Sequence, residues 1–139
     1  MNAIKLMLPL PPRELHKNEA PWTKGAKMRR QRLKRAWTGQ VLAIARQQAP
    51  PKPFAKASIS LHYFVANNQA KNHDDDGLTH WFAAGRDVLQ TTYTVGRNKC
   101  NDGACIVVND RHFVQAAPPL CTMDKTNPRL EVTITEIES

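Results

Sequence analysis

The sequence lacks the features that mark membrane-spanning, secreted and repetitive proteins. No apolar run approaches the roughly 18 residues that a membrane-spanning helix needs, and residues 1–9 carry no signal-peptide cleavage pattern. Only three cysteines are present, an odd number without tight pairing, which argues against a disulfide framework. No internal repeat or low-complexity segment occurs. We therefore expect a cytoplasmic protein with no membrane partner.

Acidic residues are also scarce, with 12 Asp and Glu against 20 Lys and Arg, and the formal net charge is +8. Such an excess implies a polyanionic partner, although charge alone does not separate a nucleic acid from an acidic membrane surface. With 139 residues and 41% hydrophobic content, the chain is long enough for one domain with a real core. We expect a single domain over residues 1–139.

Hydrophobic periodicity predicts an α/β (α+β) fold, with a small mixed sheet and two main helices packed on it. The first helix should place Leu33, Trp37, Val41 and Ile44 on one face. The expected elements are strands at 3–8 and 57–65, helices at 26–48 and 75–90, short strands at 91–95, 105–108 and 113–116, and a strictly alternating strand at 130–137. Residues 96–103 are predicted to form a turn or loop.

Three consecutive carboxylates, Asp74, Asp75 and Asp76, stand out in this basic chain. At about 4 Å two such charges repel by roughly 1 kcal/mol in water and about 4 kcal/mol at an effective dielectric of 20. A hard divalent cation with oxygen ligands would relieve that repulsion. In an extended segment Asp74 and Asp76 would converge, just before a helix N-terminus that favours phosphate. Asp110, after the apolar Val107–Val108, could add a third ligand. The alternative is that one aspartate merely caps the helix.

At these residues the chain resembles the RusA family of Holliday-junction resolvases, in particular its divergent phage and prophage members. Four stretches in the family's order carry the resemblance. They are the opening Leu8-Pro9-Leu10-Pro11-Pro12-Arg13-Glu14-Leu15 with Asn18 and Trp22, the Asp74-x-Asp76-x-Leu78 core with Asp87, the pair Asn109-Asp110, and the closing Leu130-Glu131-Val132-Thr133-Ile134-Thr135-Glu136.

The resemblance implies a homodimeric endonuclease that cuts branched DNA with Mg²⁺, or alternatively Mn²⁺, and no small-molecule cofactor. It places the metal ligands at Asp74, Asp76 and Asp110. Gly77 stands where the family has asparagine, and His80 stands near the expected position of its catalytic lysine, with Arg86 further along. Histidine supplies a lysine's charge only when it is protonated. Residues 91–104 form an insertion relative to many relatives.

Basic residues dominate the segment from 17 to 35, where Glu19 is the single acid. Lys27, Arg30 and Lys34 should share one helical face that tracks phosphates, since an ordinary solvated face usually mixes both signs. The predicted DNA contacts are Lys17, Asn18, Lys24, Lys27, Arg29, Arg30, Lys34 and Arg86. Trp37 is predicted to pack in the core, and Trp22, in a loop among lysines, is the better candidate of the two for stacking on a base.

Three functions remain open at the level of sequence. The first is a metal-dependent endonuclease in which Asp74, Asp76 and Asp110 bind the metal and His80 or Arg86 stabilises developing charge. The second is a DNA-binding protein that has lost catalysis with the family's lysine, and the third is an RNA-binding domain. A zinc site built from Cys100, Cys105, Cys121 and His112 lacks the usual close cysteine pairs, so idle thiols are favoured.

Overall fold

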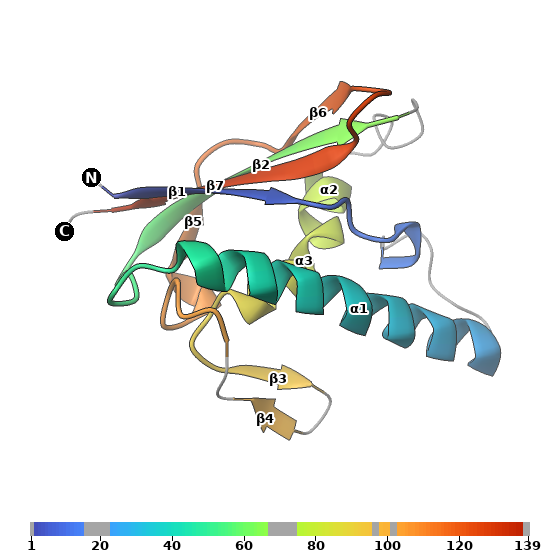
Figure 1. Ribbon diagram of the computed structural model, residues 1–139, viewed down its shortest axis with the longest axis horizontal. Helices are drawn as coiled ribbons and strands as arrows, with labels where there is room; N and C mark the ends of the chain where they lie inside the picture. Colours follow the sequence, from blue (N-terminus) through green and yellow to red (C-terminus); the bar gives the residue numbers. More distant parts are fainter. Residues whose placement is uncertain (1, 16–22, 67–74, 96–97, 101–102, 138–139) are drawn as a thin grey trace.

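The computed structural model describes residues 2–15, 23–66, 75–95, 98–100 and 103–137 (Figure 1). It contains a five-stranded mixed sheet, one long helix, short helices and a separate two-stranded hairpin. The elements are β1 (Ala3–Leu8), η1 (Arg13–Leu15), α1 (Lys24–Gln48), β2 (Ala57–Val65), α2 (Asp75–Trp81), α3 (Ala83–Val88), β3 (Tyr93–Val95), β4 (Asn98–Cys100), η4 (Asp110–His112), β5 (Phe113–Gln115), β6 (Leu120–Met123) and β7 (Arg129–Glu136).

The sheet has β7 between β1 and β2, and both pairings of β7 are antiparallel. The other edge of β2 is shared by two short parallel strands. β5 pairs with Ala57–Ile59 at the beginning of β2, and β6 pairs with His62–Val65 at its end. The predicted mixed sheet is therefore confirmed, while β6 was not expected from the sequence.

Alternation along the long strands places one side chain in two in the core. In β2 the odd-numbered residues from Ala57 to Val65 are buried, and their even-numbered neighbours are half-buried. The same alternation runs through β1 and β7. The helices lie on one face of the sheet (Figure 1), so these buried side chains form the core between sheet and helices. Burial of apolar surface contributes about 25 cal/mol per Å².

Helix α1 begins two residues earlier than predicted because Thr23 is its N-cap. The Thr23 hydroxyl oxygen accepts from the Ala26 N–H at 3.0 Å. The helix ends at Gln48, just before Pro50 and Pro51. Its second half supplies Trp37, Val41 and Ala45 to the core, which confirms the predicted burial of Trp37.

Two tryptophans fix the proline-rich segment that leaves β1. The Trp37 indole N–H donates to Pro9 O at 3.0 Å, and the Trp81 indole N–H donates to Pro12 O at 2.9 Å. Proline lacks an N–H and cannot join a ladder through it, but its carbonyl oxygen still accepts. The segment is thus attached to both α1 and α2, and it leads directly into η1.

The expected single helix over 75–90 is wrong, because α2 and α3 are separated at Phe82. In a continuous helix the Phe82 N–H would donate to Leu78 O. Here the buried Tyr63 hydroxyl donates to Leu78 O, and the Phe82 N–H donates to Thr79 O at 3.3 Å. A hydroxyl from β2 therefore occupies the position of the helical partner. The domain has one main helix instead of two, although the large apolar residues of this region are buried: Leu78, Trp81, Phe82, Val88 and Leu89.

The region from 91 to 108 also differs from the prediction. Residues 98–100, expected in a loop, form β4 and pair with β3. Residues 105–108, expected as a strand, make only isolated bridges through Val107. Cys105 has φ 60°, a left-handed conformation that interrupts an extended run. Where the chain returns from the hairpin, position 103 requires a glycine, because a Cβ there would lie 1.8 Å from Gln90 O.

Within the described residues, no helix is both long and apolar enough to cross a lipid bilayer.

Candidate functional site

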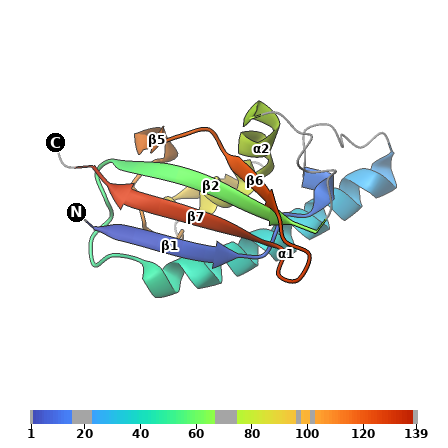
Figure 2. The same ribbon diagram turned by 90° about the horizontal axis from the view of Figure 1, so that it is seen from above.

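The first half of α1, residues 24–36, carries the densest charge of the described chain. None of these thirteen residues is buried, and only Arg30 and Leu33 are half-buried. They include seven cations and no acid: Lys24, Lys27, Arg29, Arg30, Arg32, Lys34 and Arg35. In both views this half of α1 extends past the end of β1 and the sheet (Figures 1 and 2). It forms a cationic arm, a name used below for residues 24–36.

The cationic arm is electrostatically unfavourable for an isolated helix. Like charges three or four residues apart, such as Arg30 and Lys34, destabilise a helix by about 0.2–0.5 kcal/mol per pair. Cations in the first turn also oppose the helix dipole, and α1 has no acid there. The arm nevertheless makes little use of core packing to compensate. This cost is understandable if a bound polyanion neutralises the charges.

Three of the cations continue the core-facing line of α1 beyond the core. Arg30 precedes Trp37 by seven residues and Lys34 precedes Val41 by seven, a spacing that returns to nearly the same helical face. Lys27 lies one turn before Arg30 on that face. The helix thus confirms that Lys27, Arg30 and Lys34 share a side, while their contact with DNA stays a prediction.

Among the described residues, one carboxylate, that of Glu14 in η1, reaches this arm. Arg29 Nε lies 3.1 Å from Glu14 Oε2, and Arg30 Nε donates to Glu14 O at 3.0 Å. A hydrogen bond from the Glu14 backbone N–H lowers the pKa of the Glu14 carboxyl, and the Arg29 guanidinium lowers it further. An exposed pair of this kind contributes about 0–1 kcal/mol. Glu14 balances one of the seven charges, so the arm keeps a large positive excess.

The predicted metal ligands are only partly placed. Asp74 lies outside the described residues, and Asp76 is described by its backbone alone, at the second position of α2. The exposed His80 follows it by four residues, so the two positions lie one turn apart on α2. No group of three or more metal-ligating side chains is found among the residues whose side chains are described. The side chains of Asp74, Asp76 and Asp110 are not among those described. That metal site stays a prediction.

Asp110 does not end a strand as the sequence suggested. It opens η4, where the Asn109 side chain accepts from the Arg111 N–H at 3.1 Å, and η4 leads into β5. Because β5 pairs with the beginning of β2, η4 lies near that end, whereas α2 lies near the other end of β2 (Figure 2). The strand expected at 105–108, which would have ended just before Asp110, does not form, because Cys105 has a positive φ and a turn follows. The role of Asp110 as a metal ligand stays a prediction.

Arg86, predicted to contact DNA, packs against β5. Its guanidinium carbon lies 5.5 Å from the centroid of the Phe113 ring, and Nη2 donates to Phe113 O at 3.5 Å. The side chain is half-buried between α3 and β5. It has a structural role that sequence reasoning missed, because the contact joins positions 27 residues apart, and its role toward DNA stays a prediction.

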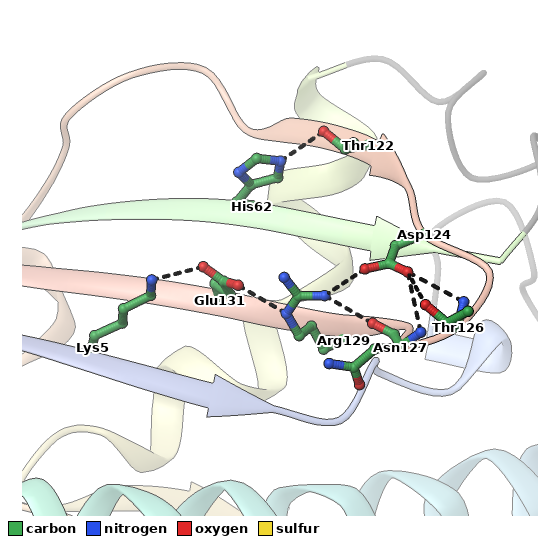
Figure 3. A network of polar contacts seen from close by, with 8 residues as sticks. All are labelled: Lys5, His62, Thr122, Asp124, Thr126, Asn127, Arg129 and Glu131. Carbon is green, nitrogen blue, oxygen red and sulfur yellow. Dashed lines mark hydrogen bonds and ion pairs between the residues drawn. The ribbon is translucent and has the colours of Figure 1, made fainter.

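The sheet face opposite the helices carries a polar network that sequence reasoning also missed (Figure 3). Arg129 lies at its centre, with Nη1 2.9 Å from Asp124 Oδ2 and Nε 2.8 Å from Glu131 Oε2. The guanidinium carbon lies 3.8 Å from the Phe64 ring centroid, and His62 stacks on the same ring at 4.1 Å. Only the short spacing of Arg129 and Glu131 on the last strand could have suggested it.

The charges of this network cancel. Lys5 Nζ lies 3.0 Å from Glu131 Oε1, so two cations face two carboxylates. Lys5, and then Arg129, lowers the pKa of the Glu131 carboxyl. Hydrogen bonds from Thr126 and Arg129 lower the pKa of Asp124, and Asp124 followed by Glu131 raises the pKa of Arg129. This network therefore has no net charge, in contrast to the seven cations of the cationic arm.

Other predicted residues fall into two groups. Lys17, Asn18 and Trp22 lie outside the described residues. Cys105 and Cys121 are half-buried, and the Cys100 side chain is not described. Among the side chains that the structure describes, none forms the zinc cluster considered above.

Comparison of the chain with models of known protein families gives no match, and a comparison with curated proteins gives none either.

Proposed function

We propose that this protein is a metal-dependent endonuclease that acts on branched DNA and holds its phosphates with the cationic arm. The observation that carries the proposal is the arm itself, with seven cations, no acid and no buried position over thirteen residues. A polyanion that releases counterions gains affinity from such a surface without regard to base sequence. The polar network on the opposite face of the sheet, which has no net charge, offers no comparable surface.

The catalytic part of the proposal rests on the acidic entry to α2 and on the resemblance of its residues to RusA resolvases. Carboxylate oxygens are the donors that Mg²⁺ and Mn²⁺ prefer, so Asp74, Asp76 and Asp110 are chemically suited to hold such an ion. The ion would supply Lewis-acid stabilisation of the phosphate under attack. Exposed His80, one turn after Asp76, would hold a proton near the developing charge.

Cleavage of a synthetic four-way junction tests the proposal directly. We expect nicks with Mg²⁺ and none after chelation, and we expect Asp74→Asn, Asp76→Asn and Asp110→Asn each to abolish nicking while binding persists. A linear duplex of the same sequence serves as the control substrate. Near wild-type turnover of one variant at saturating Mg²⁺ would remove that residue from the metal site, and for Asp110 the arrangement around β2 makes this the sharpest of the three tests.

The role of His80 is tested by comparing His80→Lys with His80→Ala across pH 6 to 9. A histidine that acts in its charged form should give a rate that falls as pH rises and the imidazole loses its proton. We expect His80→Lys to keep activity at the alkaline end, where the wild type loses it, and His80→Ala to lose the activity that the wild type shows at the acidic end. Wild-type profiles for both variants would make His80 a bystander.

A DNA-binding protein without catalysis is the second candidate, favoured by the absence of lysine from α2. It predicts junction binding with no nicking under any metal. Competition with single-stranded and double-stranded RNA separates both candidates from an RNA-binding domain, because RNA should compete poorly if branched DNA is the ligand. A homodimer, expected from the resemblance, is tested by light scattering of the free protein.

A further inference from the structure

The cations of the arm lie on opposite sides of the helix. At about 100° per residue, Lys27, Arg30 and Lys34 fall within about 40° of the line through Trp37, Val41 and Ala45. Arg32 falls about 180° from that line, and Arg29 and Arg35 lie about 120° from it on either side. We call the first set the inner stripe and the second set the outer stripe.

Both stripes are open to a ligand. Lys27 and Lys34 of the inner stripe and Arg32 and Arg35 of the outer stripe are all exposed, whereas Arg30 is half-buried beside Glu14. A helix that uses one side for DNA would gain nothing from cations on the other side, where acids would relieve the repulsion. The arm has no acid on either side.

The dimensions of the arm suit a position between two backbones. Thirteen helical residues extend about 20 Å, and the helix with its side chains is about 10–12 Å across. Because the arm extends past the sheet (Figures 1 and 2), the described part of the domain covers neither stripe over most of that length. Strands of phosphate can therefore approach from two directions.

We propose that the cationic arm lies between two phosphodiester backbones that belong to adjacent arms of a branched DNA. The inner stripe contacts one backbone and the outer stripe contacts the other. This inference rests on the proposed function, and it assigns the preference for branched over linear DNA to the two-sided charge of α1. A linear duplex that lies against the outside of the arm reaches one stripe at a time.

Two charge-matched double variants test the proposal. Lys27→Gln with Lys34→Gln removes the exposed inner cations, and Arg32→Gln with Arg35→Gln removes two outer cations. Lys52→Gln with Lys56→Gln, two exposed positions that follow α1, is the control for net charge. Circular dichroism and urea unfolding establish that each variant keeps the fold. Binding to a four-way junction and to a linear duplex is measured without divalent metal from 50 to 300 mM salt.

On the junction, both the inner and the outer variant should lower the slope of log affinity against log salt, by roughly 0.9 for each phosphate that a cation no longer neutralises and about 1.8 for each pair. On the linear duplex, only one of the two should lower it. The control pair should change neither slope by more than a small fraction of that amount.

Two results would overturn the inference while leaving the proposed function intact. If only one pair matters on the junction, the arm is one-sided. If both pairs lower the slope equally on linear and branched DNA, the arm lies in the groove of a single duplex. Failure of the wild-type protein to bind either DNA would instead contradict the proposed function, and the inference with it.

Discussion

The two halves of α1 have the same backbone and opposite composition. From residue 37 onward, Trp37, Val41 and Ala45 enter the core and Arg46 is the only charged residue. Before residue 37 the same helical face carries Lys27, Arg30 and Lys34, and no residue of that half is buried. What differs is the presence of a sheet beneath the helix. Core packing therefore accounts for the composition of the second half and does not account for that of the first half.

The largest effect on stability should come from truncating a core side chain in the second half of α1. Trp37 is 3% exposed, donates to Pro9 O and meets the Phe82 ring edge-on at 6.1 Å. We expect Trp37→Ala to lower the free energy of unfolding by about 3–5 kcal/mol, measured by urea denaturation. Lys34→Ala, on the same helical face but within the cationic arm, should change the free energy of unfolding by less than about 0.5 kcal/mol. Equal losses at both positions would contradict the division of α1.

Overpacking at the contact between α1 and α3 should have the next largest effect. A Cβ at Gly85 would lie 2.7 Å from Phe82 Cε1 and 2.7 Å from Trp37 Cη2. We expect Gly85→Ala to cost about 1–3 kcal/mol, despite the better helix propensity of alanine. Gly39→Ala is the matched control, because no atom lies within 4 Å of a Cβ there. It should stabilise the protein by about 0.5–1 kcal/mol.

Removal of the Tyr63 hydroxyl should have a moderate effect. Tyr63 is fully buried, its ring stacks on Trp81 at 5.0 Å, and its hydroxyl donates to Leu78 O. Burial raises the pKa of that hydroxyl far above its ordinary value, so it stays a donor throughout the neutral range. We expect Tyr63→Phe to cost about 1–2 kcal/mol in chemical denaturation. An unchanged stability would mean that the break at Phe82 does not depend on this hydrogen bond.

The smallest expected effect is the loss of stability at acidic pH when two carboxylates become protonated. The pKa values of the Asp124 and Glu131 carboxyls are lowered in the folded protein, so their contribution to stability is complete above the unfolded values of about 3.9 and 4.3. It is lost as pH falls through the lower folded values. Urea unfolding at pH 7, 4 and 3 should show a decrease below about pH 4. The double variant Asp124→Asn and Glu131→Gln should show a shallower decrease, and an identical one would contradict the assignment.

Local sequence pattern was sufficient to predict the long strands and helix α1. It was insufficient where contacts between residues distant in sequence determine the structure. The bounds of β1 and β2 follow from alternation and from the prolines that flank them. The break between α2 and α3 does not, because the Tyr63 hydroxyl comes from a strand that is distant in sequence. β6 was missed because its alternation is weak and its pairing partners in β2 lie more than fifty residues earlier.

The same reasoning applies to the candidate site. The inner stripe could be predicted because a helix fixes the spacing of Lys27, Arg30 and Lys34. The burial of Arg86 against Phe113 could not be predicted, since nothing local marks that contact. The conformation of Cys105, which removes the strand expected before Asp110, also lacks a sequence signal, because positive φ is uncommon outside glycine.

The most direct test of a nucleic-acid role for the cationic arm is the triple variant Lys27→Gln, Arg30→Gln and Lys34→Gln, measured for both junction affinity and stability. The control triple is Lys52→Gln, Lys56→Gln and Lys125→Gln, which removes equal charge at exposed sites outside the arm. We predict a salt slope lower by about 2.7, at roughly 0.9 per phosphate, and a loss of unfolding free energy of no more than about 1.5 kcal/mol, which the Arg30 hydrogen bond to Glu14 O accounts for. An unchanged slope with a larger loss of stability would show that these residues serve the fold and not a nucleic acid.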